Sequence, residues 1–245
     1  MRGFVDLHCH WIAEIDDGVR TPEAGVDLLR RLHRAGFDVV VATPHMRPGM
    51  FDNDKGMLER AFAKMCPHIV DVPDLPDVHL SSEHFFDDVV YNRLLRGTGL
   101  PYPDLAPKKS AKRGVLIEVS PQGFPAQFQH RLFDLARRGL RPVIAHPERY
   151  QPVWKDDACL DPLLDAGAVL LLDVCALVGK YGRAAERAAE KLLDEEAYEA
   201  ACSDAHRPED ADVTAEAIEV LEERVGKEEA VRLLKDGPRG ILGLA

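Results

Sequence analysis

The stretch Val39-Val40-Val41-Ala42-Thr43-Pro44-His45 decides the fold of this 245-residue chain. Its four consecutive apolar residues predict a strand that is buried on both faces, as the strands of a parallel sheet are. Upstream, Thr21 and Pro22 predict the start of a helix, and Gly36 predicts its end. A helix therefore leads directly into a buried strand, and a histidine follows that strand.

The same alternation of helix and strand extends along the whole chain. Amphipathic stretches predict helices between the strands, and this order is typical of parallel α/β folds. We expect a single closed or nearly closed β/α barrel over residues 1–245, because barrels of this length commonly form one domain. A doubly wound open sheet is the alternative, although its usual phosphate loops, GxGxxG and GxxxxGK[ST], are missing. The seven predicted strands are residues 4–7, 39–42, 78–80, 115–117, 143–145, 169–172 and 200–202.

The charge balance argues against several classes of function. Lys and Arg number 31 and Asp and Glu number 42, which gives a formal net charge of −11. An acidic protein repels phosphate backbones and anionic lipid, so we expect neither nucleic acid nor a membrane surface as its main partner. The longest apolar run, residues 166–172, is far shorter than the ~20 residues that span a bilayer. Five scattered cysteines without a CxxC pair indicate reduced thiols and a cytoplasmic location.

Imidazoles and carboxylates follow six of the seven predicted strands, at the end where β/α barrels carry their active sites. Side chains two residues apart on an extended chain share a face, so such pairs can reach the same ion. Nitrogen and oxygen ligands without thiolate suit manganese, iron or zinc, and the number of ligands suits two or three ions. The nine candidate ligands are His8, His10, Asp17, His45, Glu83, Glu118, His146, Asp204 and His206.

Two other features lie off this pattern. The remaining histidines are expected on the surface or in helices; they are His33, His68, His79, His84 and His130. Residues 97–113 contain three prolines and end in a basic cluster, which fits either a plain surface loop or a flap near the substrate. We expect residues 97–102 to border the mouth of the site and to tune substrate choice. The basic residues Lys108, Lys109, Lys112 and Arg113 are expected at the opposite rim.

Eight short motifs resemble a known superfamily, in order and over nearly the whole chain. They are Asp6-Leu7-His8-Cys9-His10, Ile15-Asp16-Asp17-Gly18, Ala42-Thr43-Pro44-His45, Leu116-Ile117-Glu118, Gly123-Phe124-Pro125, Ala145-His146-Pro147-Glu148-Arg149-Tyr150, Gly179-Lys180-Tyr181-Gly182 and Ser203-Asp204-Ala205-His206. The sequence resembles the polymerase-and-histidinol-phosphatase (PHP) superfamily, and more closely its bacterial CpsB/YwqE-type protein-tyrosine phosphatases. The resemblance implies a distorted seven-stranded β/α barrel and a trinuclear, usually manganese-dependent site on the nine ligands.

The chemistry expected of such a site is hydrolysis of a phosphate ester. Clustered divalent ions lower the pKa of a bound water and neutralise the phosphoryl oxygens. Arg149, and with it Arg47, can hold the phosphate through paired N–H groups. His206 can protonate the leaving group if a proton is needed. Cysteine-based phosphatases are excluded, because no cysteine of this chain begins a Cys-x5-Arg motif.

Three functions remain open at this stage. The first is a phosphotyrosine phosphatase acting on a bacterial tyrosine autokinase that controls capsule or exopolysaccharide synthesis. The second is a phosphatase of a small phosphoester, such as histidinol phosphate. The third is a binding or regulatory module without catalysis, which the complete ligand set disfavours. An open, shallow mouth would favour the first function, and a deep closed pocket would favour the second.

Overall fold

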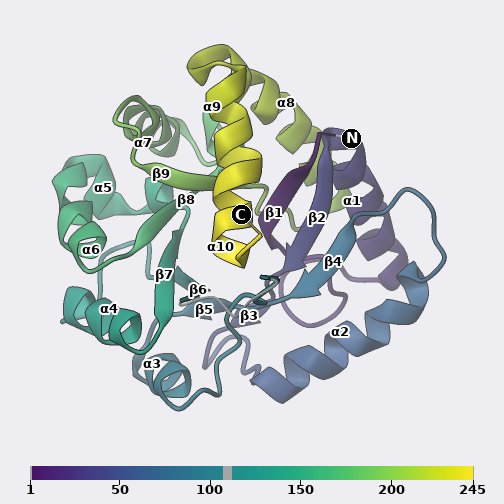
Figure 1. Ribbon diagram of the computed structural model, residues 1–245, viewed down its shortest axis with the longest axis horizontal. Coiled ribbons are helices and arrows are strands. Elements are labelled where there is room, and N and C mark those ends of the chain that lie inside the picture. The colour runs from purple at the N-terminus through teal and green to yellow at the C-terminus, as the bar shows by residue number, and fades with distance from the viewer. Residues whose placement is uncertain (1, 107–111, 245) are drawn as a thin grey trace.

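Parallel strands alternate with helices in the computed structural model, which describes residues 2–106 and 112–244 (Figure 1). Within these residues the strands are β1 Phe4–Cys9, β2 Phe37–Ala42, β3 His45–Met46, β4 Asp77–Leu80, β5 Glu83–Phe85, β6 Arg113–Glu118, β7 Leu140–Ala145, β8 Val169–Asp173 and β9 Tyr198–Cys202. The helices are α1 Pro22–Ala35, α2 Lys55–Ile69, α3 Asp88–Leu95, α4 Phe128–Arg137, α5 Gln151–Lys155, α6 Asp161–Asp165, α7 Arg183–Asp194, α8 Pro208–Val225, α9 Lys227–Val231 and α10 Gly237–Leu242. In the described ranges, no helix combines the length and the apolar character that crossing a membrane requires.

The strands form two parallel sheets, with the orders β1-β2-β4 and β3-β5-β6-β7-β8-β9. A parallel α/β fold is therefore confirmed, but the single closed barrel of seven strands is not what the structure shows. Two of the expected strands end at Ala42 and Leu80 as predicted, but after a short interruption the chain forms a further strand in each case, from His45 and from Glu83, in the other sheet. Pro44 lies in the first interruption and has no N–H to continue a ladder.

The first and last strands approach each other beyond the ends of their sheets. Cys9 forms an isolated parallel bridge with Ala205, in the turn after β9. The His10 amide donates to the Ala205 carbonyl at 2.9 Å, and the Asp204 amide donates to the His8 carbonyl at 3.0 Å. Residues close to the start of the sequence are thus held beside residues nearly two hundred positions later, where β1 and β9 end.

Local sequence explains why α1 begins and ends where it does. The Thr21 hydroxyl accepts a hydrogen bond from the Ala24 amide, and Pro22 is the first helical residue. Gly36 ends the helix at φ 117°, a conformation that residues with a Cβ rarely adopt. Leu28 and Leu32 lie buried on the face that packs on the sheet. These boundaries confirm the prediction made from the sequence.

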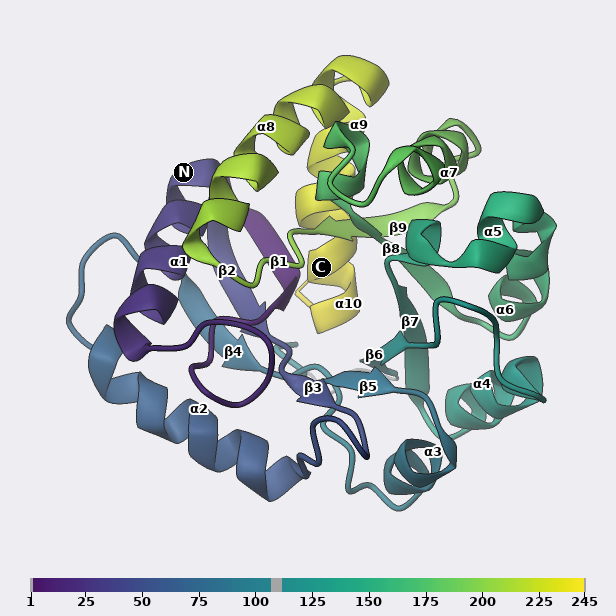
Figure 2. The same cartoon turned by 180° about the vertical axis from the view of Figure 1, so that it is seen from behind.

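Apolar side chains fill the space between the two sheets at the amino-terminal ends of the strands. Tyr102, Ile241 and Leu242 are buried there with Val5 and Leu7. In Figure 1, α10 lies across this end of the ring of strands, and Figure 2 shows the opposite end, where the turns that follow β1 and β3 lie. One end of the interior is therefore apolar, and the other is free to carry polar side chains.

The prediction that residues 97–102 border the site is not confirmed, because Tyr102 lies at the opposite end of the strands. The Tyr102 amide donates to the Gly114 carbonyl, at the start of β6 and four residues before Glu118. The Tyr102 hydroxyl donates to the Leu7 carbonyl at 2.8 Å, and the side chain is fully buried. This segment follows α3, which has already carried the chain back to the amino-terminal ends of the strands. Arg113 donates to the Tyr102 carbonyl at the same end, as expected; Lys108 and Lys109 lie outside the described residues.

Two histidines differ from the expectation of surface or helical positions. His84 lies in β5 and is fully buried, with its Nδ1 donating to the Leu116 carbonyl at 2.9 Å. Its Nε2 accepts from the Leu100 amide at 3.1 Å, so both ring nitrogens are satisfied. His79 is half-buried in β4. His33, His68 and His130 lie in helices, as predicted.

Candidate metal centre

The ends of the strands bring all nine predicted ligands into one cluster. β3 pairs with β5 so that His45 stands opposite Glu83, and Glu118 is the last residue of β6. Within the described part of the chain, the donor atoms form four overlapping groups, and in each group they lie within 4.8 Å of one another. The groups are His10, Asp17, His45 and His206; His8, His10 and Asp204; His8, Glu83 and His146; and His45, Glu83 and Glu118.

Glu83 lies at the middle of the cluster. Its Oε2 is 3.0 Å from His45 Nδ1 and 3.3 Å from His8 Nε2, and its Oε1 is 3.0 Å from His146 Nε2. Burial alone would raise the pKa of this carboxyl, but the neighbouring charges of His8 and His45 hold it well below its usual range. Glu83 therefore contacts histidines from three different strand ends.

Asp204 and His8 form the second part of the cluster. Asp204 Oδ1 lies 3.1 Å from His8 Nε2 and 3.5 Å from His10 Nε2. Burial alone would lower the pKa of His8, but the charges of Asp204 and Glu83 raise it to about 9. Asp204 and His146 have left-handed backbones, at φ 44° and 35°. Such strain is rare outside glycine and concentrates at functional sites.

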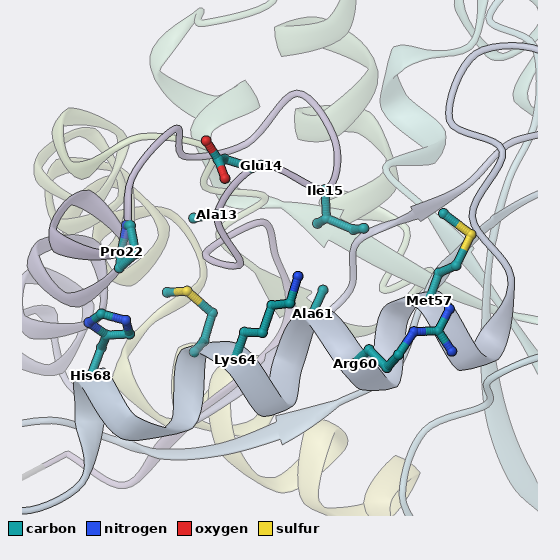
Figure 3. Close-up of a pocket in the computed structure, with 10 residues that line it drawn as sticks. Ala13, Glu14, Ile15, Pro22, Met57, Arg60, Ala61, Lys64 and His68 are labelled. Carbon is teal, nitrogen blue, oxygen red and sulfur yellow. The ribbon is translucent and has the colours of Figure 1, made fainter.

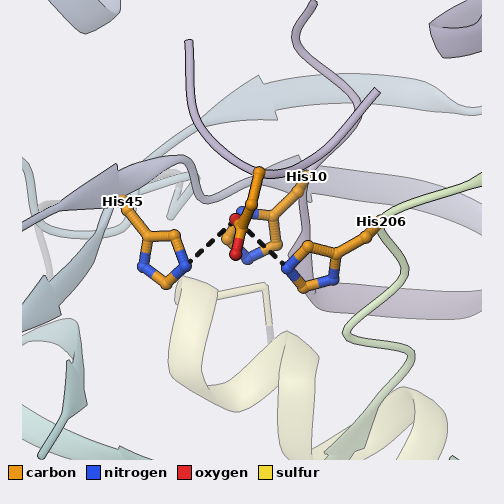
Figure 4. Close-up of side chains that lie close together, drawn as sticks. His10, His45 and His206 are labelled. Carbon is orange, nitrogen blue, oxygen red and sulfur yellow. Dashed lines mark ion pairs between the residues drawn. The ribbon is translucent and has the colours of Figure 1, made fainter. Parts of the chain in front are cut away.

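Asp17 joins the cluster from the loop that follows β1. Its Oδ1 lies 3.3 Å from His45 Nε2 and 3.5 Å from His206 Nε2. Figure 4 shows the rings of His10, His45 and His206 gathered around one point. The His10 and His206 rings stack with their centroids 4.1 Å apart. His206 Nδ1 donates to the Asp204 carbonyl at 2.9 Å, which leaves Nε2 directed at the cluster as a ligand atom.

Two carboxylates that the sequence did not single out hold this cluster in place. Asp16 Oδ2 accepts from His10 Nδ1 at 2.7 Å and from the His45 amide at 3.0 Å. It therefore fixes the tautomer in which His10 Nε2 has a free lone pair. Asp6 accepts from the Ser203 hydroxyl and amide, beside Asp204. The sequence does not reveal either role. Asp16 cannot be told apart from the neighbouring Asp17, and Asp6 lies inside a strand and not at its end, where ligands were expected.

The two predicted arginines flank the cluster on different sides. Arg149 Nη1 lies 2.5 Å from Asp204 Oδ2, and its guanidinium carbon is 4.4 Å from the centre of the Tyr181 ring. The Arg47 guanidinium stacks on the ring of Phe85 at 4.1 Å. Burial, followed by the charge of Glu83, raises the pKa of Glu118 to about 7, and both arginines oppose that rise. Cations thus stand at the rim of a site rich in carboxylates.

The donor set fits divalent cations. Five imidazoles and four carboxylates converge without a thiolate, which suits manganese, iron or zinc. Buried polar atoms are normally hydrogen-bonded, and a set of exceptions at one place needs an explanation. Among the described residues, five buried atoms of this cluster form no hydrogen bond, although His45 Nδ1 and Asp204 Oδ1 are within ion-pair distance of other members; the five are His8 Nδ1, His45 Nδ1, Glu118 Oε2, His146 Nδ1 and Asp204 Oδ1.

A family model described as "Capsular polysaccharide synthesis, CpsB/CapC" matches residues 4–243. The chain belongs to this family. The matched range runs from the first residue of β1 to just beyond α10, so the family assignment applies to nearly the whole chain. The resemblance seen in the short motifs is thereby confirmed.

Relatives in the CpsB/CapC family show similarity over the same length. The tyrosine-protein phosphatase YwqE of Bacillus subtilis (strain 168) is 27% identical over 229 residues, covering 91% of this chain and 86% of the relative. The tyrosine-protein phosphatase CpsB of Streptococcus pneumoniae is 23% identical over 244 residues, covering 97% and 98%. A crystal structure described as one of YwqE and CpsB, "unique metal-dependent tyrosine phosphatases", matches with a TM-score of 0.86 at 24% identity. It covers 98% of this chain and 95% of that one, and shows that the fold is shared.

Proposed function

We propose that this CpsB/CapC member is a metal-dependent protein-tyrosine phosphatase. Its substrate would be an autophosphorylating bacterial tyrosine kinase that controls capsule or exopolysaccharide synthesis. The observation that carries the proposal is the cluster of five imidazoles and four carboxylates in a chain whose relatives are named tyrosine-protein phosphatases. The five cysteines, none of them in a disulfide within the described residues, favour a cytoplasmic location.

We assign the nine clustered side chains as ligands of two or three divalent ions, with manganese as the expected metal. The ligands would be His8, His10, Asp17, His45, Glu83, Glu118, His146, Asp204 and His206. When bound, the ions would supply a water of lowered pKa and positive charge for the phosphoryl group. Glu83 belongs to two of the donor groups, so its carboxylate would contribute ligand atoms to both.

The other side chains of the site would position the substrate. Arg149 is aligned by Asp204 and by the Tyr181 ring, so its remaining N–H groups are available to phosphate oxygens. Arg47 would provide a second cation from the side of Glu118. A tyrosine phenolate, whose pKa is ~10, leaves more readily than an alkoxide, so the demand for a general acid is small. His206 is better placed as a ligand than as a proton donor, because its Nδ1–H is held by the Asp204 carbonyl.

We also propose that residues 1–245 form one domain, as a distorted seven-stranded barrel of the PHP type. The interruptions after Ala42 and Leu80 join the two sheets through shared chain segments. The bridge between Cys9 and Ala205 brings the two outer strands together. Both features favour the description as an opened barrel and argue against two independent sheets.

The test is hydrolysis by the purified chain loaded with manganese. A phosphotyrosine peptide should be hydrolysed much faster than histidinol phosphate, and a chelator should abolish the activity. Cys9→Ser is the matched control for a thiol mechanism, since Cys9 is buried beside the cluster with its Sγ directed at the Ala205 carbonyl. Cys9→Ser should keep most of the activity. Faster turnover of histidinol phosphate, or an active chelated protein, would contradict the proposal.

A further inference from the structure

A groove of about 350 Å³ lies between α2 and the loop that follows β1. Figure 3 shows α2 along one side of this groove and Ala13, Glu14 and Ile15 along the other. Its lining residues are Ala13, Glu14, Ile15, Pro22, Met57, Arg60, Ala61, Lys64, Met65 and His68. The nine clustered side chains do not include any of them, so the groove is separate from the candidate metal centre.

The groove and the metal centre share one wall. Ile15 lines the groove, and the next two residues are Asp16 and Asp17, which contact the clustered histidines. The buried Asn53 side chain donates to the Ile15 carbonyl at 3.0 Å and to the His45 carbonyl at 2.9 Å. α2 begins two residues after Asn53. A chain lying in the groove would therefore be close to a phosphate held at the centre.

Positive charge lines the α2 side of the groove. Arg60 and Lys64 are spaced four residues apart, which places them on one face of the helix, and both are exposed. Within residues 2–106 and 112–244, neither Arg60 nor Lys64 forms a hydrogen bond or an ion pair with the rest of the protein. In Figure 3 Lys64 extends from α2 toward the loop, whereas the Glu14 carboxylate lies farther from the helix. Two unpaired cations side by side are notable on a chain of net charge −11.

We propose that this groove binds acidic residues that flank the phosphotyrosine of a protein substrate. The inference rests on the proposed phosphatase function and defines its substrate class more closely. Four residues of helix rise about 6 Å, and alternate residues of an extended peptide are about 6.6 Å apart. Acidic side chains at alternate positions of a bound peptide would therefore meet Arg60 and Lys64 in turn. Met57, which is exposed, offers an adaptable apolar contact to the backbone between them.

The experiment compares three substrates of the manganese-loaded protein. The first is a phosphotyrosine peptide with Glu at alternate positions on both flanks, the second has Gln at those positions, and the third is p-nitrophenyl phosphate. We expect kcat/KM to favour the Glu peptide over the Gln peptide by about fivefold, which is the size that two exposed ion pairs provide. The double variant Arg60→Ala/Lys64→Ala should lose this preference and keep its turnover of p-nitrophenyl phosphate. High salt should remove the preference from the unmodified protein.

The matched control is Arg137→Ala/Arg138→Ala, which removes the same charge at the end of α4, beside the start of β7. This variant should keep the full preference for the Glu peptide. Equal loss in both double variants would overturn the groove proposal, as would a preference that survives Arg60→Ala/Lys64→Ala. Fluorescence anisotropy with the unphosphorylated Glu peptide separates the two proposals. If the Glu peptide binds and the Arg60→Ala/Lys64→Ala variant loses this binding, the groove proposal is supported. If no phosphopeptide is hydrolysed in the same preparation, the phosphatase function fails.

Discussion

Asp16 and Asp17 are adjacent in one loop but contact different atoms of the same cluster. Asp17 is half-exposed and lies against the outer nitrogens of His45 and His206. Asp16 is buried and accepts from His10 Nδ1, from the His45 amide and from the Gly18 amide. One carboxylate is thus a candidate ligand, and the other orients two ligands.

Asp16→Asn should weaken manganese binding without unfolding the protein. The amide keeps one acceptor oxygen, but it loses the charge that holds His10, and losses of this kind typically cost 10–100-fold in metal affinity. We expect activity to be restored by excess manganese. Titration calorimetry measures the affinity, with Asp52→Asn on the neighbouring exposed turn as the control. Unchanged affinity in Asp16→Asn would show that Asp16 is only structural.

Glu118→Gln and Asp204→Asn should lower kcat by about 100-fold or more. Their charges act on the reacting groups, so their loss affects the chemical step. Arg149→Ala should act more on KM, because Arg149 would bind the phosphate from the rim of the site. Steady-state kinetics on a phosphotyrosine peptide at saturating manganese separates the two effects. A variant of Glu118 that changes KM alone would argue against its role as a ligand.

At the scale of the elements, α10 closes the apolar end of the interior. Ile241 and Leu242 pack there with Tyr102, and α10 contacts β1, β6 and β9. A methyl group at Gly114 would lie 2.7 Å from Ile241 Cγ2, so the packing around this helix is tight. The stability of α10 therefore supports the ends of strands whose other ends hold the metal centre.

Ile241→Ala should lower the free energy of unfolding by about 2–4 kcal/mol, since it leaves a cavity in a buried cluster. At this chain length, thermal unfolding should shift down by roughly 2–4 °C for each kcal/mol. Metal content and kcat at 25 °C should stay near those of the unmodified protein. Leu164→Ala on α6 is the control, because Leu164 is already 37% exposed. A similar shift in both variants would contradict the closing role of α10.

At the scale of the whole molecule, the buried carboxylates make stability depend on bound cations. Glu83 and Asp204 are nearly inaccessible to solvent, and Glu118 is 7% exposed. Manganese at 100 times its Kd should stabilise the fold by about 2.7 kcal/mol for each site, and a chelator should remove that gain. Differential scanning calorimetry checks this, with Asp204→Asn expected to show a smaller shift. A melting temperature that does not respond to manganese would count against a metal centre.

The sequence predicted much of this molecule because strand ends are visible in it. Each predicted ligand follows an apolar run, and the parallel topology brings those ends together. The interruptions after Ala42 and Leu80 were not predicted, because a change of sheet leaves no mark in hydrophobic periodicity. His84 was misplaced because its partners, the Leu116 carbonyl and the Leu100 amide, come from other parts of the fold. Tyr102 was misplaced for the same reason, because its amide bonds to the Gly114 carbonyl of β6.

The pairing of the segments after β1 and β9 at the cluster has a consequence for synthesis on the ribosome. His8 and His10 emerge first, and Asp204 and His206, which complete their surroundings, emerge nearly two hundred residues later. The Ser203 hydroxyl, from the same late segment, donates to Asp6. In a nascent chain, His8 and His10 therefore lack their contacts with Asp204 and His206 until most of the protein has been translated. Metal capture in the cell would follow folding, and prematurely ended chains would bind manganese poorly.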